Sequence, residues 1–155
     1  MRRAYLSLGT NLGDRAHHLR DGVALLVGSD PYRVSHVYVT EPVGGVAQDD
    51  FWNLVVELET NDSPRALLER ARAVETAHHR VRETRWGPRT LDVDVLLVGE
   101  LVSEDPEILV PHPRMYERRF VLVPLRELNA DLVSDEQLAA ASGAVVPLGT
   151  LDSLR

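Results

Sequence analysis

Two residue types, cysteine and lysine, are absent from this chain of 155 residues. Cysteine is absent, which excludes disulfides, thiolate zinc sites and cysteine nucleophiles. Lysine is absent too, because all 17 basic residues are arginine, so a phosphate-binding lysine of the Walker type is excluded. No apolar run approaches the ~20 residues that a membrane-spanning helix needs. The N-terminus lacks the apolar stretch and cleavage site of a secretory signal, so we expect a cytoplasmic protein with no membrane partner.

Positive charge is scarce overall, with a formal net charge of -7 at pH 7. Proteins that neutralise many nucleic-acid phosphates usually carry a positive surplus, so we expect no nucleic-acid partner. The arginines are nevertheless unevenly spread, because four of them fall within ten residues that contain a single acid, Glu83. These four are Arg80, Arg82, Arg85 and Arg89. The segment predicts a local cationic site on an acidic protein.

Chain length and composition predict a single domain over residues 1–155. A period of two residues predicts strands over residues 4–8, 34–40, 53–60 and 91–98. A period of three to four predicts a helix with Leu19, Val23, Leu26 and Val27 on one side, and a second from Ser63, its cap, to about His79. Gly99-Glu100 predicts a hairpin turn. The order strand, helix, strand, strand, helix, strand predicts an α+β fold, with a ferredoxin-like antiparallel sheet and helices packed on one side.

Two aspartates begin the last predicted strand. Asp92 and Asp94 share a face, about 6 to 7 Å apart, because alternate side chains of a strand point the same way. Leu96 and Val98 continue that face by the same alternation. Two carboxylates on such a face repel each other unless a cation or several donors compensate them, and magnesium is a cation that suits them. On spacing alone, a solvated strand end or pairing with arginines accounts for them equally well.

The arginine-rich segment precedes this pair directly. Guanidinium groups bind phosphate oxygens in a bidentate fork and keep their charge at any working pH. Taken alone, the arginines also fit a solvated charge run, but together with the aspartates they indicate a metal-bound polyphosphate. Gly87-Pro88 interrupts regular structure between the two, which favours a movable loop beside a rigid strand.

Several ordered segments match one known family. The segment Arg85 to Leu96 resembles the signature of 6-hydroxymethyl-7,8-dihydropterin pyrophosphokinase, an enzyme of folate biosynthesis. Further resemblance, in the same order and spacing, lies in residues 4–14, 38–42, 51–53, 80–82, 110–112 and 118–120, and at Glu75. The resemblance extends from the first strand to about residue 128. The chain departs from the family pattern at Glu41 and Pro113, which bear on loop contacts and nucleotide affinity.

The resemblance implies a magnesium-dependent diphosphokinase that transfers pyrophosphate from ATP to the pterin and releases AMP, with mobile active-site loops that close over both. Two Mg²⁺ ions would be bound by Asp92 and Asp94. The implied catalytic residues are Arg82, Arg89, Asp92 and Asp94. The implied ATP-binding residues are Glu75, Arg82, Trp86, Arg89, Val95, His112 and Arg118. The implied pterin-binding residues are Thr40, Pro42, Val43, Phe51, Asn53, Trp86 and Phe120.

These assignments also make physical sense. A pterin is flat, with apolar faces and an edge of donors and acceptors, so two aromatic rings and one amide suit it. The alternatives are ordinary core packing for Phe51 and Phe120 and a structural role for His112. Two other functions remain open, a nucleotidyl transferase or cyclase with a strand aspartate pair, and a non-catalytic ligand-binding module. We expect a monomer that binds the two small-molecule substrates.

Overall fold

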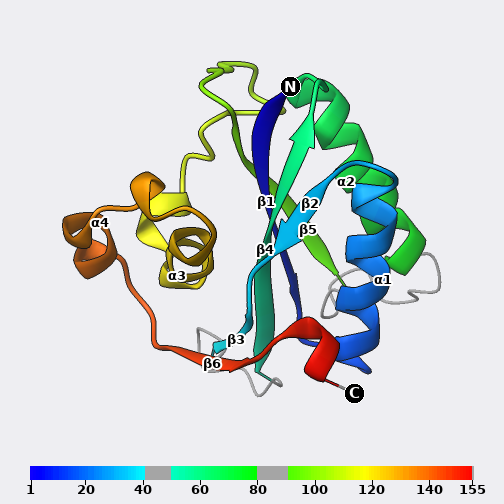
Figure 1. The fold of residues 1–155 in the computed structure, drawn as a ribbon, viewed down its shortest axis with the longest axis vertical. Helices are drawn as coiled ribbons and strands as arrows, with labels where there is room; N and C mark the ends of the chain where they lie inside the picture. Colours follow the sequence, from blue (N-terminus) through cyan, green and yellow to red (C-terminus); the bar gives the residue numbers. More distant parts are fainter. Residues whose placement is uncertain (41–49, 80–90, 155) are drawn as a thin grey trace.

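A six-stranded antiparallel sheet forms the centre of the molecule (Figure 1). The computed structural model describes residues 1–40, 50–79 and 91–154. The strand order is β5-β1-β4-β3-β6, and β2 pairs with β4 beside β3. The strands are β1 (Arg2–Thr10), β2 (Tyr32–Val34), β3 (Val37–Thr40), β4 (Phe51–Thr60), β5 (Asp92–Val98) and β6 (Val145–Gly149). The predicted α+β fold with a ferredoxin-like sheet is confirmed.

Two helices cover one face of the sheet, α1 (Arg15–Val27) and α2 (Pro64–His79). Each begins at a side-chain cap, since Asp14 Oδ1 accepts from the His17 N–H at 3.1 Å and Ser63 Oγ accepts from the Ala66 N–H at 3.2 Å. The cap predicted at Ser63 is therefore confirmed. The apolar sides of both helices pack on the alternate apolar residues of β1, β4 and β5. This face is an uninterrupted hydrophobic core.

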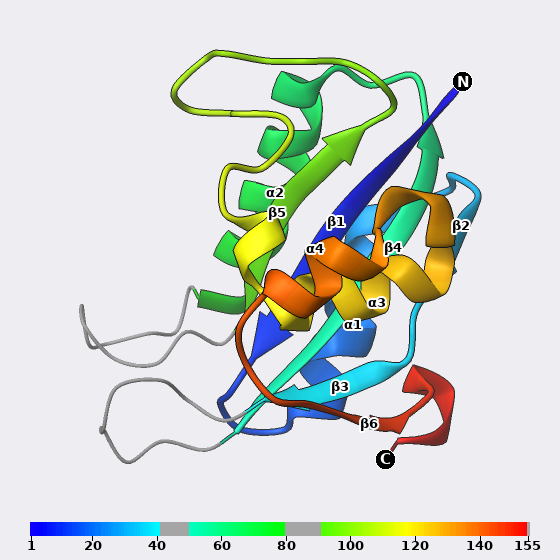
Figure 2. The ribbon, with the colours of Figure 1, turned by 90° about the vertical axis from the view of Figure 1, so that its left-hand side faces the viewer.

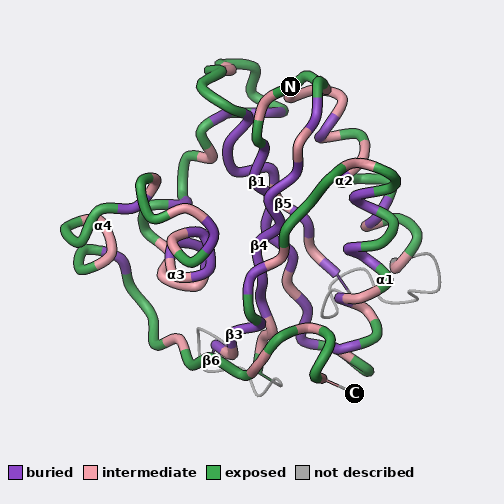
Figure 3. Tube along the Cα trace, viewed as in Figure 1, coloured by how far each residue is buried: buried purple, intermediate pink, exposed green. Residues whose placement is uncertain are grey.

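The opposite face carries α3 (Arg119–Leu128), which follows the short 3-10 helix η1 (Met115–Glu117), and α4 (Asp135–Ala140) packs against α3. Leu122 and Leu125 of α3 are fully buried against Val55 and Leu96 of the sheet. Helices therefore lie on both faces rather than on the one side predicted (Figures 1 and 3). Across the described ranges, no helix has the length and apolar character needed to cross a membrane.

An irregularity in β5 changes which residues share its faces. Tyr5 pairs with Leu97 and Leu6 pairs with Val95, so Leu96 is an extra residue in the ladder. Such a bulge shifts the alternation by one position. Leu96 belongs to the α3-side core, whereas Val98 belongs to the α1–α2 core. The prediction that Val98 continues the aspartate face is wrong for this reason.

Two further strand predictions are corrected. The strand predicted over 34–40 is divided into β2 and β3, because Ser35 interrupts the pairing and its hydroxyl accepts from the Val55 N–H at 2.9 Å. The turn predicted at Gly99-Glu100 forms, but the chain beyond it does not pair with β5. It makes an isolated bridge between Ser103 and Val110 instead. The hairpin prediction is wrong, since β5 remains the edge of the described sheet.

Candidate active site

A cavity of about 850 Å³ opens on the α3 side of the sheet. Its floor is built from one end of three adjacent strands, because Ser7 of β1 pairs with Asp94 of β5, and Gly9 pairs with both Asp92 and Asn53. The rest of the boundary comes from the ends of β3 and β4, from η1, from the start of α3 and from the segment that leads into β6. The lining residues are Ser7, Leu8, Gly9, Thr40, Phe51, Asn53, Asp92, Asp94, Arg114, Glu117, Arg118, Phe120, Ser142, Gly143, Ala144 and Val145.

The two aspartates lie together on this floor, as predicted. Both are partly exposed to the cavity, while Val93 between them is buried in the core of the opposite face. Glu75 of α2 fixes this part of β5, because its Oε2 accepts from the Val93 N–H at 3.0 Å. The carboxylates are therefore presented by a strand that is held on both sides. Glu75, predicted to bind ATP, contacts the strand backbone beside them.

The aspartate pair fits a hard divalent cation. Within the described ranges, no group of three or more histidine, aspartate or glutamate side chains is arranged to hold a metal alone. Magnesium commonly takes only one or two carboxylates and completes its shell with water and substrate phosphates. Two carboxylates beside a large cavity thus meet the requirement of Mg²⁺ bound together with a phosphate ligand.

Asn53 is a fixed polar group in the cavity floor. Its residue is only 6% exposed, and its Nδ2 donates to Thr40 Oγ1 at 3.0 Å. A Cβ placed at Gly9 would lie 2.5 Å from Asn53 Oδ1, so only glycine permits this close approach. Thr40 and Gly9 together determine how the amide is presented.

The two phenylalanines of the chain both reach this cavity. Phe51 begins β4 and Phe120 lies in the first turn of α3, and both are partly exposed. The guanidinium of Arg118 lies 5.7 Å from the centroid of the Phe120 ring. Ordinary core packing does not account for Phe51, which belongs to neither buried cluster. Phe120 also packs against the α3-side core. Partly exposed aromatic rings at a cavity suit a flat ligand.

His112 is held beside the cavity by its backbone and its ring. Its N–H donates to Leu96 O at 2.9 Å, and its Nδ1 accepts from the Arg114 N–H at 3.2 Å. Burial lowers the pKa of His112, the positive charges of Arg118 and Arg114 lower it further, and Asp94 opposes them. A neutral ring whose Nδ1 accepts carries its proton on Nε2, so it offers one N–H donor.

The remaining predicted residues fall into two groups. Val95 lies on β5, but its side chain is buried in the core of the α1–α2 face and is absent from the cavity lining. The others lie outside the described residues, and they are Pro42, Val43, Arg82, Trp86 and Arg89.

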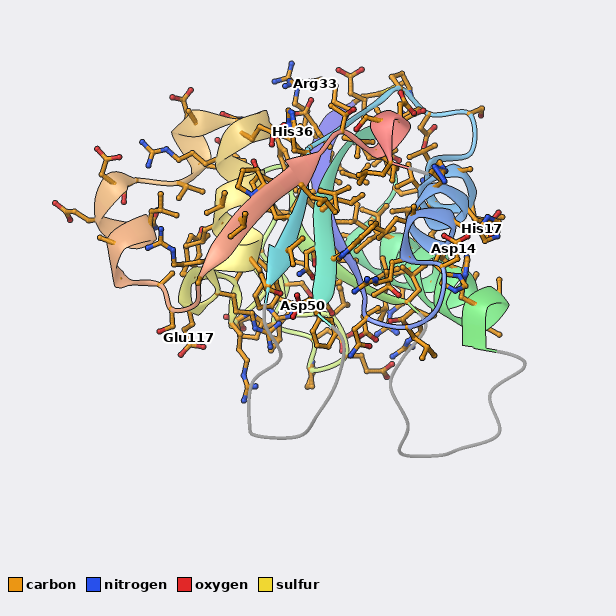
Figure 4. The ribbon with its side chains drawn as sticks, turned by 90° about the horizontal axis from the view of Figure 1, so that it is seen from below. Asp14, His17, Arg33, His36, Asp50 and Glu117 are labelled. Carbon is orange, nitrogen blue, oxygen red and sulfur yellow. The ribbon has the colours of Figure 1, made fainter. Side chains whose placement is uncertain are left out.

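Sequence reasoning missed several lining residues. Arg114 and Glu117 lie in the same segment as His112. Arg114 could have been found from the sequence, because it is a cationic residue only two positions after His112, a predicted phosphate ligand. Glu117 and Asp50 lie on the same side of the molecule, opposite Arg33 and His36 (Figure 4). The residues 142–145 gave no comparable signal, because they follow a short helix and carry no charge.

The fold and the site define a class of protein, an α+β domain whose cavity combines paired carboxylates and arginine with an amide and two phenylalanine rings. Such a site suits a phosphate-bearing ligand beside a flat heterocycle. A sequence model of the family 7,8-dihydro-6-hydroxymethylpterin-pyrophosphokinase matches residues 5–130. The chain belongs to this family.

Individual relatives agree with that membership. The 2-amino-4-hydroxy-6-hydroxymethyldihydropteridine pyrophosphokinase of Bacillus subtilis is 48% identical over 128 residues, which are 81% of this chain and 77% of the relative. The protein of the same name from Methylorubrum extorquens is 45% identical over 136 residues, 86% of each chain. The bifunctional protein FolKE of Lactococcus lactis subsp. cremoris is 41% identical over 132 residues, which cover 83% of this chain but 38% of that protein.

Proposed function

We propose that this chain binds ATP and 6-hydroxymethyl-7,8-dihydropterin together in this cavity and transfers pyrophosphate from the first to the second, with Mg²⁺ held at Asp92 and Asp94. Family membership makes the chain a pyrophosphokinase of folate biosynthesis. The observation that carries the residue-level proposal is the meeting of Asp92 and Asp94 with Asn53, Phe51 and Phe120 around one cavity.

The pterin half of the cavity is assigned by shape and polarity. Phe51 and Phe120 offer aromatic faces to the flat ring, and the Asn53 amide offers a donor and an acceptor to its polar edge. Thr40 holds that amide through their 3.0 Å hydrogen bond. The ring is thereby oriented with its hydroxymethyl group toward the aspartates.

The phosphate half is assigned by charge. Mg²⁺, when bound, would neutralise phosphate oxygens and acidify the attacking hydroxyl. Arg118 presents a guanidinium at the cavity wall, and His112 supplies a neutral N–H donor beside it. Both suit the binding and alignment of phosphate oxygens. Arg82, Arg89 and Trp86 are proposed to add further contacts to ATP, and Pro42 and Val43 to the pterin.

The reaction follows from this alignment. The pterin hydroxymethyl oxygen attacks the β-phosphorus of ATP, the bond from that phosphorus to the α,β-bridging oxygen breaks, and AMP leaves. No protein nucleophile is needed, because phosphoryl-type transfer depends mainly on positioning and on stabilising oxygen charge. A nucleotidyl transferase or cyclase would not need the Asn53, Phe51 and Phe120 set, and a ligand-binding module would not consume ATP. The proposal also includes a single catalytic domain acting as a cytoplasmic monomer.

Product analysis tests the proposal. Chromatography of a mixture of protein, Mg²⁺, ATP and hydroxymethyl-dihydropterin should give AMP and a pterin diphosphate in equal amounts. Omitting the pterin or chelating the metal should abolish both products. Formation of ADP and a pterin monophosphate would contradict pyrophosphate transfer.

A further inference from the structure

One wall of the cavity comes from a part of the chain that the family match does not include. The match ends at residue 130, yet four consecutive lining residues, Ser142 to Val145, lie beyond it. They join α4 to β6, and this connection passes along the end of the sheet where β3 lies (Figure 2). The wall therefore belongs to the site by position, although sequence similarity does not place it there.

Hydrogen bonds hold this wall to the start of α3. The Ser142 N–H donates to Glu117 O at 3.0 Å, and the Arg119 N–H donates to Ser142 O at 3.2 Å. These two bonds form a parallel bridge between Ser142 and Arg118. Because Arg118 and Glu117 also line the cavity, the wall is fixed directly to the element that presents Phe120.

The other end of the wall is held by the sheet. Val145 begins β6 and pairs with Thr40, the last residue of β3. Thr40 is the residue that accepts the hydrogen bond from Asn53. The wall therefore connects the start of α3, which carries Phe120, to Thr40, which holds Asn53. It is hydrogen-bonded at both ends.

The wall is small and uncharged. Ser142, Gly143 and Ala144 are exposed, and a Cβ placed at Gly143 would meet nothing within 4 Å. Its polar groups are backbone amides, carbonyls and one hydroxyl, which suit the neutral polar edge of a heterocycle. A triphosphate would instead require the cationic and metal-binding groups, which other elements supply.

We propose that residues Ser142–Val145 form a specificity-determining wall of the pterin subsite, which limits the size of the heterocycle that fits beside Asn53. The inference rests on the proposed function, since it names the part of the cavity that selects one of the two substrates. Substrate selection in this chain is then encoded partly outside the family-matched residues.

Filling the wall tests this proposal. In Ala144→Leu, a larger side chain occupies cavity space, so the KM for the pterin should rise at least tenfold while the KM for ATP stays within twofold. Val146→Leu is the control, because Val146 lies two residues further along the chain, in β6, is 61% exposed and does not line the cavity. It should leave both KM values unchanged. Pterin binding should also be measured by fluorescence titration with a non-hydrolysable ATP analogue present.

A second pair of variants tests the hydrogen bond that holds the wall to Glu117. Ser142→Pro removes the N–H that donates to Glu117 O, and Ala141, at φ -77 and ψ 151, already has a conformation that a following proline accepts. Its pterin KM should rise severalfold, and clearly more than that of Ser142→Ala, which loses the hydroxyl but keeps the N–H and therefore the anchor. Circular dichroism confirms folding of each variant.

The outcomes separate the two proposals. If Ala144→Leu binds the pterin as the wild type does, or weakens pterin and ATP equally, the wall proposal is overturned while wild-type AMP formation still supports the function. If Ala144→Leu does not fold, equal pterin affinity in Ser142→Pro and Ser142→Ala overturns it. If the wild type forms no AMP, the proposed function fails, and the fluorescence titration still decides whether Ala144 borders a pterin subsite.

Discussion

The two faces of the sheet are made by the same strands, but one face forms a hydrophobic core and the other lines the cavity. On the α1–α2 face, Leu6 of β1 and Val93 of β5 are buried in a continuous apolar core. On the other face, the next residues, Ser7 and Asp94, line a cavity. Strand alternation therefore lets one run of sequence serve stability with one set of side chains and substrate binding with the other.

The α3 face is itself divided along its length. Toward one end, Val55 and Leu96 pack against α3, while toward the other the sheet is left open beneath the cavity. The open end carries the polar side chains of Asp92 and Asn53, which line the cavity. The comparison indicates that the cavity exists because the α3 face is left unpacked at one end. The complete core on the opposite face stabilises the strands that form its floor.

Asp94→Asn should give the largest effect on function. Removing one carboxylate charge from the proposed metal site should lower kcat by about 10³-fold or more, because a bound metal contributes several kcal/mol to the transition state. Thermal unfolding should change little, since the side chain is not packed in a core. Asp152→Asn, at an exposed carboxylate outside the cavity lining, is the charge-matched control. Retained turnover with normal magnesium dependence in Asp94→Asn would refute the metal assignment.

Leu6→Ala should give the complementary result. Leu6 is fully buried on the α1–α2 face, so its truncation should lower the free energy of unfolding by about 3 kcal/mol. Below the unfolding temperature, kcat should remain within a few-fold of wild type. Leu25→Ala, at a leucine that is 53% exposed, should change stability by about 0.5 kcal/mol or less. A large loss of kcat in folded Leu6→Ala would show that the faces are not separable.

Gly9→Ala tests the close contact between the backbone of β1 at Gly9 and the side-chain amide of Asn53. The new Cβ would displace Asn53, whose Oδ1 lies 2.5 Å from that position, and pterin affinity should fall by about 30-fold, or ~2 kcal/mol. Asn53→Ala should have a similar effect on the pterin KM. In the double variant the two losses should not add, because both remove the same oriented amide. Full additivity would mean that Gly9 acts by another route.

Glu127→Gln should give the smallest effect, and one that depends on pH. Burial of Glu127 acts to raise its pKa, but hydrogen bonds from Tyr38 at 2.6 Å and His36 at 2.8 Å outweigh it and lower the pKa. A carboxyl with a lowered folded-state pKa stabilises the fold at neutral pH, and this contribution is lost as the pH falls below about 4.5. The wild type should therefore exceed Glu127→Gln by about 1 kcal/mol at pH 7 and converge with it in acid. A gap that widens in acid would contradict this sign.

Much of the fold could be predicted because its signals are local. The spacing of Leu19 and Leu26 predicts α1, the Ser63 cap predicts the start of α2, and alternation around Val56 predicts β4. The bulge at Leu96 depends on pairing with β1 and leaves no local signal, so alternation along the sequence places Val98 on the wrong face. In α3 the apolar residues run almost continuously and include Pro124, so no helical period was evident.

The candidate site was predictable where the functional side chains lie close together in the sequence or match a known family pattern. The aspartate pair is recognisable because both residues lie on one strand, and the phenylalanines and Asn53 because they match a family pattern. Arg114 and the wall at Ser142–Val145 come to the cavity only through packing of η1, α3 and β6 on the sheet. Their contribution is a tertiary one, which neither charge nor periodicity along the chain reveals.

The central claim is that the open end of the α3 face transfers pyrophosphate as one unit. Phosphorus NMR of the complete reaction tests it most directly, because it follows every phosphorus atom. We predict that the three ATP signals are replaced by one AMP signal and the two coupled signals of a pterin diphosphate, and that Asp94→Asn leaves ATP unchanged. Appearance of ADP with a pterin monophosphate, or of pyrophosphate free in solution, would contradict it.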